Sequence, residues 1–143
     1  MITCKSKTIK NLDKYILKEF KILDNIDLIG SFILSYEKGS SLSVLTLEML
    51  ELQSEYIGKD FSRFLTDQIN IEILKEKNNY DLFLLQAIPL GSSGLALDVL
   101  IDYYKKRLGV SYVGNGYLSK SFGEKDDFEQ FQDFMASEFL SFS

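Results

Sequence analysis

The chain has 143 residues and a mass of 16.4 kDa, and 45% of its residues are hydrophobic. A chain of this size and apolar content can bury one core, so we expect a single globular domain over residues 1–143. One cysteine, Cys4, cannot form an internal disulfide, which excludes a disulfide-stapled scaffold. The sequence contains no histidine, the usual general base and the commonest metal ligand, so we expect no metal site, no cofactor and no enzymatic activity.

Targeting and membrane signals are also missing from the sequence. No segment reaches the roughly 18 to 20 uncharged apolar residues that a membrane span requires. The start turns basic at Lys5, and no apolar stretch of signal-peptide length follows it. We therefore expect a cytoplasmic protein that does not contact membranes.

Charge is distributed unevenly along the chain, whose net charge is −5 and whose pI is about 4.8. Residues 1–21 contain six lysines and two acids, whereas residues 124–143 contain six acids and one lysine. We interpret the lysines near the start as the solvated face of a helix. Because nucleic-acid binding needs a basic surface, the low pI predicts that nucleic acid is not a partner.

The first half of the chain alternates between helix and strand patterns. Apolar residues recur every three or four positions over residues 8–23, which predicts an amphipathic helix. Residues 28–36 are short, apolar and aromatic, which predicts a strand that ends in the turn-rich residues 37–41. Residues 42–56 fit a strand and a helix about equally well. We favour a strand that forms a hairpin with the preceding one.

The middle of the chain predicts a short helix followed by two strands. Asp60 is a suitable cap for a helix that reaches Gln68. Residues 69–74 alternate as a strand does, and Asn78-Asn79 suits a tight turn into a second strand over residues 80–88. This second strand is apolar on both faces, so it should lie at the centre of a sheet, and Pro89 ends it.

The last third predicts two further helices around a β segment. Ser93 can cap a helix over residues 96–108, with Gly109 just past its end. Residues 110–118 have β-type side chains around a Gly-Asn-Gly bulge or turn, and a phenylalanine-rich helix begins at Asp126 or Asp127. The whole pattern predicts an α+β fold, with a mostly antiparallel sheet of about four to six strands and three to four helices packed on it.

Two features are candidate binding sites. The first is a glycine- and serine-rich turn between a predicted strand and a predicted helix, where backbone N–H groups could hold a phosphate or carboxylate. It comprises Gly91, Ser92, Ser93 and Gly94. The same residues also suit an ordinary capped turn, because they match neither a Walker loop nor a dinucleotide fingerprint.

The second feature is the acidic C-terminal segment. Helical spacing places Asp126, Glu129 and Asp133 opposite the phenylalanines, with Glu124 and Asp127 close by. Such a stripe can dock on a basic protein such as a toxin nuclease domain. In general character the chain resembles the small immunity proteins that neutralise bacterial toxins, which implies an inhibitor acting by electrostatic docking. Alternatives are a small-ligand module or enzyme that uses the Gly91–Gly94 turn, and a subunit of a larger assembly.

Overall fold

The computed structural model describes residues 1–87 and 96–141, with side chains described as far as Ser137. Within these residues a seven-stranded sheet carries three α-helices, which confirms the α+β class with slightly more strands than expected. The strands are β1 (Ile2–Leu12), β2 (Tyr15–Asp24), β3 (Asp27–Lys38), β4 (Ser43–Leu52), β5 (Leu82–Gln86), β6 (Ser111–Gly114) and β7 (Tyr117–Ser121). The helices are the short 3-10 helix η1 (Ser54–Tyr56), α1 (Ser62–Glu76), α2 (Leu97–Leu108) and α3 (Asp127–Ser141).

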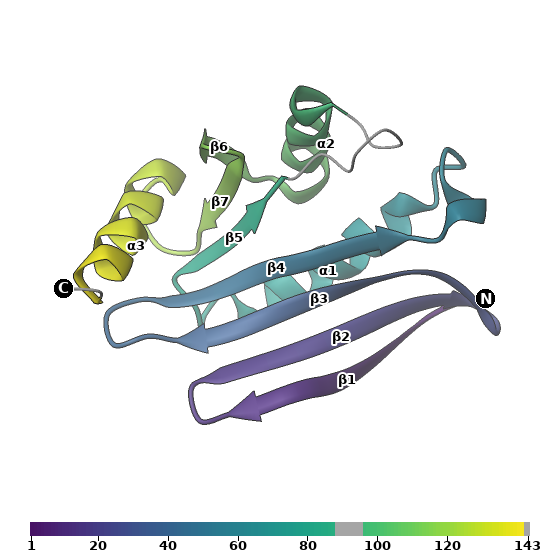
Figure 1. The fold of residues 1–143 in the computed structure, drawn as a ribbon, viewed down its shortest axis with the longest axis horizontal. Helices are drawn as coiled ribbons and strands as arrows, with labels where there is room; N and C mark the ends of the chain where they lie inside the picture. The colour runs from purple at the N-terminus through teal and green to yellow at the C-terminus, as the bar shows by residue number, and fades with distance from the viewer. Residues whose placement is uncertain (88–95, 142–143) are drawn as a thin grey trace.

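The sheet consists of two antiparallel halves joined by one parallel pair. The strand order is β1-β2-β3-β4-β5-β7-β6, and only β4 and β5 run parallel. Antiparallel neighbours can be joined by tight turns, but parallel neighbours need a crossover. Helix α1 is part of that crossover, and it lies against one face of the sheet, behind β3 and β4 in Figure 1.

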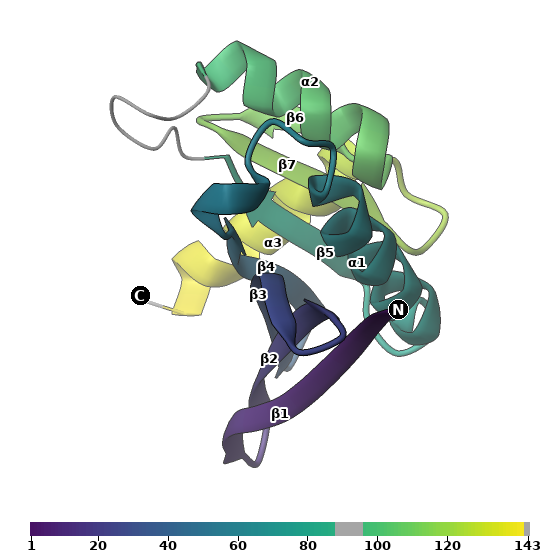
Figure 2. The same ribbon diagram turned by 90° about the vertical axis from the view of Figure 1, so that its right-hand side faces the viewer.

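Helices cover both faces of the sheet, but not equally. Helices α1 and α2 pack on one face, over a large core that runs from β2 to β7. Helix α3 packs on the other face, over a smaller core centred on Leu82, Leu84 and Phe131. Figure 2 shows α1 and α2 on one side of the sheet and α3 on the other. Because α3 contacts only β6 and β7 among its major neighbours, no helix in the described part of the chain covers that face of β1–β3.

The predicted helix over residues 8–23 is wrong, because these residues form the β1–β2 hairpin with its turn at Asp13 and Lys14. Phe20 and Ile22 alternate into the core, whereas Ile9 and Leu12 are exposed. Side chains four apart share a face in both a helix and a strand, so Ile16 and Phe20 fit either period. The pairing of β2 with β3 on its other side decides in favour of the strand.

The strand predicted over residues 69–74 is also wrong, since these residues belong to α1. Ile69 and Ile73 are buried one helical turn apart, while Ile71 is 47% exposed and Leu74 is 64% exposed. The Asn78-Asn79 segment ends this helix, with the Asn79 N–H donating to the carbonyl of Glu76, instead of joining two strands.

Other predicted elements are confirmed. The strand over residues 28–36 lies within β3 and pairs with β4 as a hairpin. β5 is buried on both faces at the centre of the sheet. Helix α2 ends at Gly109, whose φ of 65° is the left-handed conformation expected of a C-terminal cap. β6 and β7 form a hairpin around Gly114-Asn115-Gly116. Pro89 and Ser93 lie outside the described residues.

Gly30 allows β3, β4 and α1 to approach one another closely. A Cβ atom at this position would lie 2.5 Å from the carbonyl oxygen of Glu51 and 2.9 Å from Cδ2 of Leu65. Both neighbours belong to packed elements, so a larger residue would force the strand pair and the helix apart.

We therefore expect Gly30→Ala to lower the free energy of unfolding by about 1–3 kcal/mol, through overpacking between the sheet and α1. Urea denaturation followed by circular dichroism would measure the loss. The matched control is Gly123→Ala, because a Cβ at Gly123 meets no atom within 4 Å. Equal stability of the two variants would contradict the close packing described at Gly30.

Candidate functional site

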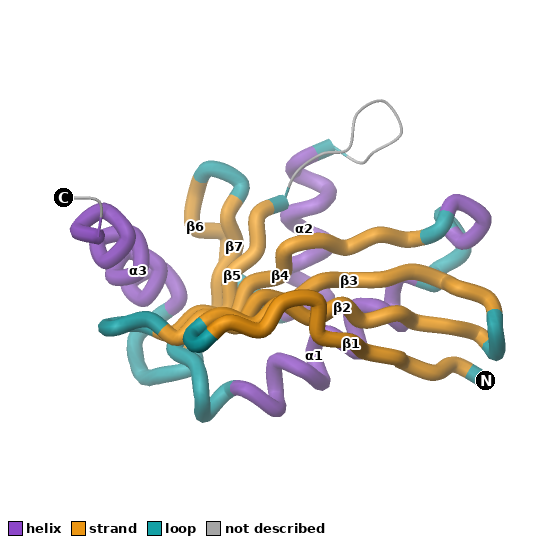
Figure 3. Tube along the Cα trace, turned by 60° about the horizontal axis from the view of Figure 1, so that its bottom comes forward, coloured by secondary structure: helices purple, strands orange, loops and turns teal. Residues whose placement is uncertain are grey.

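The parallel pair β4–β5 opens part of the way along the sheet. The strands pair from Val44 with Leu82 to Leu47 with Leu85 and then separate, because β4 continues to Leu52 while β5 ends at Gln86. β5 turns away with β7, and the N–H of Ala87 donates to the carbonyl of Gly116 at 2.7 Å. Figure 1 shows this parting, and Figure 3 shows it from another side. We call this opening the β4–β5 seam.

The seam exposes the backbone of β4 on one side. Beyond Leu47, β4 pairs with β3, and no other strand of the described residues pairs with it. Backbone N–H and C=O groups need partners, so an unpaired strand segment is suited to bind an extended ligand that carries amide groups.

A β-bulge lies at the point where the seam opens. The β3–β4 register shifts between Ile33 and Leu34, which pair with Met49 and Leu47, so Glu48 is the extra residue. Bulges redirect side chains and are frequent next to active sites. Glu48 is exposed, and its carboxylate accepts a hydrogen bond of 2.8 Å from the Ser35 hydroxyl on β3. The bulge therefore holds a carboxylate in a fixed position at the mouth of the seam.

Tyr15 lies close to this carboxylate on the face of the sheet opposite α1. Desolvation raises the pKa of the Tyr15 phenol above its ordinary value, and the negative charges of Glu48 and Glu37 raise it further, while Ser35 lowers it. The phenol therefore stays protonated at neutral pH and can donate a hydrogen bond. Glu48 and Tyr15 therefore place a hydrogen-bond acceptor and a hydrogen-bond donor on the same face of the sheet.

The loop after β4 leads into the amino terminus of α1. It contains η1 and two residues in the left-handed conformation, Gly58 with φ of 78° and Asp60 with φ of 61°. The predicted cap at Asp60 is wrong, since the helix begins at Ser62 and its N-cap residue, Phe61, makes no side-chain capping bond. The first turn contains no acidic residue, and it includes Arg63.

An uncapped helix start of this kind favours an anion. Its N–H groups have no capping side chain, and the helix dipole adds positive potential. Asp60 lies 3.9 Å from the guanidinium of Arg63, but both side chains are largely exposed, so solvent screens this pair. Because α1 is the helix of the parallel crossover from β4 to β5, its amino terminus lies near the carboxyl ends of both strands of the seam.

Helix α2 holds the start of α1 in place. The Tyr103 hydroxyl donates to the Ser62 hydroxyl at 2.8 Å. Arg107 donates to Thr66 at 3.0 Å and pairs with Asp67 at 2.8 Å. These bonds join the first two turns of α1 to α2, so the start of α1 keeps a fixed orientation.

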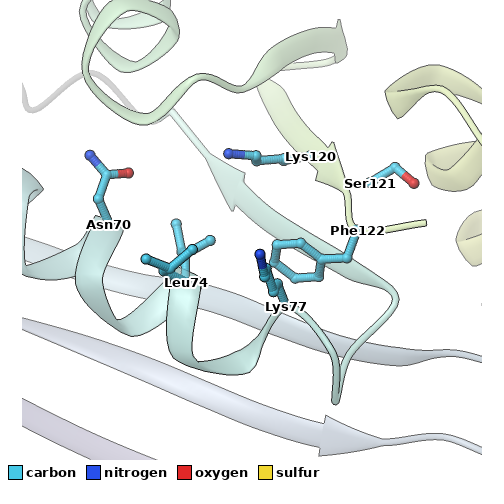
Figure 4. A pocket seen from close by; sticks show the side chains of 7 residues that line it. Asn70, Leu74, Lys77, Lys120, Ser121 and Phe122 are labelled. Atoms are coloured by element: carbon cyan, nitrogen blue, oxygen red, sulfur yellow. The ribbon is translucent and has the colours of Figure 1, made fainter. Parts of the chain in front are cut away.

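A separate hollow of about 450 Å³ lies between α1 and β7, near the other end of α1. Side chains from both elements, including Lys77 and Lys120, surround its apolar floor (Figure 4). It is lined by Asn70, Ile73, Leu74, Lys77, Lys120, Ser121 and Phe122. The hollow is near the beginning of β5 and not near its end, so it is not part of the seam.

Most of the acidic residues predicted to dock on a partner have structural roles. The Asp126 carboxylate accepts from the N–H of Glu129 at 2.8 Å, as a cap does. Asp127 accepts from the Ser111 hydroxyl at 2.5 Å and from the N–H of Ser121 at 2.8 Å, which joins α3 to β6 and β7. Asp133 is paired with Lys125. Glu124 and Glu129 are exposed.

The other sequence candidates do not form a site within the described residues. Gly91, Ser92, Ser93 and Gly94 lie outside them. Across residues 1–87 and 96–137, no three acidic or cysteine side chains gather in a way that could hold a metal ion. Partial burial raises the pKa of the Cys4 thiol, and Glu72 raises it further, so Cys4 is not an activated nucleophile.

Sequence reasoning did not find the seam or Glu48. The seam exists because β4 and β5 are parallel neighbours, and the strand predicted over residues 69–74 concealed the crossover helix between them. The available signal was the spacing of Leu65, Ile69 and Ile73, which places all three on one face of a helix.

No family model and no curated protein matches the sequence, but solved structures share the fold. The AtaT-AtaR complex bound to DNA matches with a TM-score of 0.56 at 15% identity, over 82% of this chain and 72% of that chain. AtaTR bound with AcCoA matches with a TM-score of 0.53 at 13% identity, over 83% and 72%. The ribosomal-protein-S18-alanine N-acetyltransferase from Escherichia coli matches with a TM-score of 0.53 at 13% identity, over 87% and 96%.

These matches overturn the predicted function. The expectations of an immunity-type inhibitor without enzymatic activity and of a basic protein partner are wrong, because the fold is shared with N-acetyltransferases. The expectation that nucleic acid is not a partner is overturned by a neighbour that is a complex with DNA. The missing histidine was a weak argument, since it excludes triads and most metal sites but not reactions that depend on positioning two substrates.

The contacts of α3 predict different roles for neighbouring acids. We expect Asp127→Ala to lower the free energy of unfolding by about 1–3 kcal/mol, because it leaves the Ser121 N–H and the Ser111 hydroxyl without their acceptor. Glu129→Ala, at an exposed position in the same helix turn, should lower it by less than about 1 kcal/mol, the value for an exposed acid in a first turn. Thermal and urea unfolding would compare the two, and equal effects would contradict the structural role of Asp127.

Proposed function

We propose that this protein is an acetyltransferase that binds acetyl-coenzyme A in the β4–β5 seam and transfers the acetyl group to an amine. The observation that carries the proposal is the coincidence of three features at one end of the sheet. They are the edge of β4 that pairs with no described strand, the uncapped start of α1 and the carboxylate of Glu48. The fold shared with N-acetyltransferases supports it.

The seam is chemically suited to the parts of this coenzyme. The first-turn N–H groups of α1 and the side chain of Arg63 would hold its phosphates. The backbone of Met49–Leu52 would pair with its extended, amide-containing arm. When bound, acetyl-coenzyme A supplies the acetyl group as a thioester.

Glu48 is the group best placed to handle the proton of the acceptor amine. An amine attacks a thioester only as the neutral form, so a base must remove a proton from the ammonium ion. The Glu48 carboxylate lies one residue beyond the last β4–β5 pair, and Ser35 holds it by a hydrogen bond of 2.8 Å. The protonated phenol of Tyr15 is close enough to Glu48 to feel its charge and can hydrogen-bond a substrate oxygen.

The membrane finding is consistent with an enzyme in the cytoplasm, which we propose as its location. Among the described residues, no helix is both long and apolar enough to span a bilayer. Acetyl-coenzyme A would be available there.

The first test is binding of acetyl-coenzyme A, measured by calorimetry and by thermal shift. We expect Arg63→Glu to weaken binding by at least about tenfold, because it places a negative charge where the phosphates bind. The same change should leave the melting temperature equal or higher, since an acid in a first turn stabilises a helix by about 0.3–1 kcal/mol.

Lys10→Glu is the matched control, because it makes the same change of charge on β1, away from the seam. It should bind acetyl-coenzyme A as the parent protein does. Failure of the parent protein to bind acetyl-coenzyme A at millimolar concentration would overturn the proposed function.

The second test concerns Glu48, in acetyl transfer to short peptides with free amino termini. We expect Glu48→Gln to lower kcat by roughly 10²–10⁴-fold without weakening acetyl-coenzyme A binding, because the ammonium ion loses its base. The rate of this variant should rise with pH towards the pKa of a free α-amine, about 7.7–8.0, as more of the amine becomes neutral.

Glu51→Gln removes an exposed acid from the same strand beyond the bulge and should leave kcat unchanged. If Glu48→Gln and Glu51→Gln had the same rates and the same pH profile, Glu48 would have no role in proton transfer.

A further inference from the structure

The lysines near the start of the chain have no role in the proposed acetyl transfer. The structure places four of them on one face of the β1–β2 hairpin. Lys5 is paired with Lys21, Lys7 with Glu19, and Lys10 with Leu17, and paired residues share a face of a sheet. We call Lys5, Lys7, Lys10 and Lys21 the lysine face.

The lysine face points away from α1. Phe20 and Ile22 of β2 are buried in the core beneath α1, and successive side chains of a strand alternate. Glu19 and Lys21 therefore lie on the opposite face, together with their partners on β1. Every residue of β1 is exposed, and β1 is the outermost strand of the sheet, so this face is open to a large partner (Figure 1).

One acid lies within the lysine face. Glu19 is 4.0 Å from Lys7 and 3.9 Å from Lys21, and these two lysine side chains are 70% and 48% exposed. Across the described residues no carboxylate lies within 4.0 Å of Lys5 or Lys10. The face therefore retains a positive charge after its internal pairs are counted.

The acidic residues of α3 do not cancel this charge. Helix α3 packs on β6 and β7, at the opposite edge of the sheet from β1. Six strand spacings separate β1 from β6, which is roughly 29 Å, and three separate β1 from β4, where Phe134 of α3 packs against Val44, which is roughly 14 Å. At physiological salt the Debye length is about 8 Å, so a partner at β1 is largely screened from α3.

We infer that the lysine face binds the phosphate backbone of a nucleic acid. Lys5 and Lys7 are two residues apart on an extended strand, so their charges repeat at roughly 7 Å, and a row of phosphates is also regular. The inference does not depend on acetyl transfer, because it involves neither the seam nor Glu48.

The side chains on this face also determine how nucleic acid is recognised. All four charges are lysines, which act as mobile point charges, and the β1–β2 hairpin contains no arginine to read base edges with two parallel hydrogen bonds. Binding should therefore be independent of base sequence and strongly dependent on salt. Four phosphate contacts predict that the affinity falls about a hundredfold between about 50 and 200 mM salt.

The test is fluorescence anisotropy with short labelled DNA and RNA duplexes of the same sequence, at several salt concentrations. We expect the triple variant Lys5→Gln, Lys7→Gln, Lys10→Gln to bind at least about tenfold more weakly and to lose most of the salt dependence. The matched control is Lys59→Gln, Lys105→Gln, Lys106→Gln, which changes the net charge equally at other exposed positions and should bind as the parent protein does.

A second variant acts in the opposite direction. Glu19→Gln removes the acid between Lys7 and Lys21, so we expect it to tighten duplex binding about two- to fivefold. This gain cannot come from a folding defect. Preference for the RNA duplex or for the DNA duplex would identify the kind of nucleic acid, and either result supports the inference.

Three results would overturn the inference. They are equal duplex binding by the two triple variants, an affinity that does not change with salt, and binding to phosphatidylserine vesicles by a protein that does not bind either duplex. The last result would assign the lysine face to an anionic membrane instead. Acetyl-coenzyme A binding by the lysine-face variant should be unchanged, so this inference and the proposed acetyltransferase activity can fail separately.

Discussion

The short parallel pairing of β4 with β5 is the constraint on which the rest of the structure depends. Four residue pairs join the two antiparallel halves of the sheet, and they require a crossover that includes α1. The crossover places the start of α1 at the end of the sheet where the two strands separate. Among the described residues, the separation also leaves the edge of β4 beyond Leu47 without a strand partner. The start of α1, which favours an anion, and the open edge of β4 thus both result from the parallel crossover between β4 and β5.

The unequal covering of the two faces explains where the remaining functional groups lie. The core under α1 and α2 extends from β2 to β7, whereas the core under α3 is limited to the second half of the sheet. No helix of the described residues therefore covers the face of β1–β3 opposite α1, and this face carries Tyr15, Ser35 and the lysine face. Glu48 reaches the same face because it follows Leu47, which points into the core beneath α1, and successive side chains of a strand alternate. Without the bulge, alternation along β4 would direct the residues beyond it to the wrong sides of the sheet.

The elements that the sequence predicted correctly are those whose apolar pattern fits only a helix or only a strand, and not both. β5 is a run of four buried apolar residues, and α2 combines a helical apolar face with a glycine in the left-handed conformation at its end. The errors occurred where apolar residues are four positions apart, a spacing that puts them on one face of either a helix or a strand. These residues are Ile16 and Phe20 in β2 and Ile69 and Ile73 in α1. Tertiary pairing resolved both, because β2 has a strand on each side and α1 lies over the sheet. The candidate site could not be predicted from local patterns, since it depends on which strands are neighbours.

The charge of this protein shows why a total is a poor guide to its partners. A net charge of −5 favoured a basic partner and disfavoured nucleic acid, but the two ends of the chain differ in sign and lie at opposite edges of the sheet. A partner responds to the charges within about one Debye length of its contact, which is much shorter than the width of a seven-stranded sheet. Acids near the start of α3 also make hydrogen bonds within the protein. Asp126 caps the helix, and Asp127 bonds to β6 and β7. The lysines of β1 have no comparable structural role, so their charge is available to a partner even though the protein as a whole is acidic.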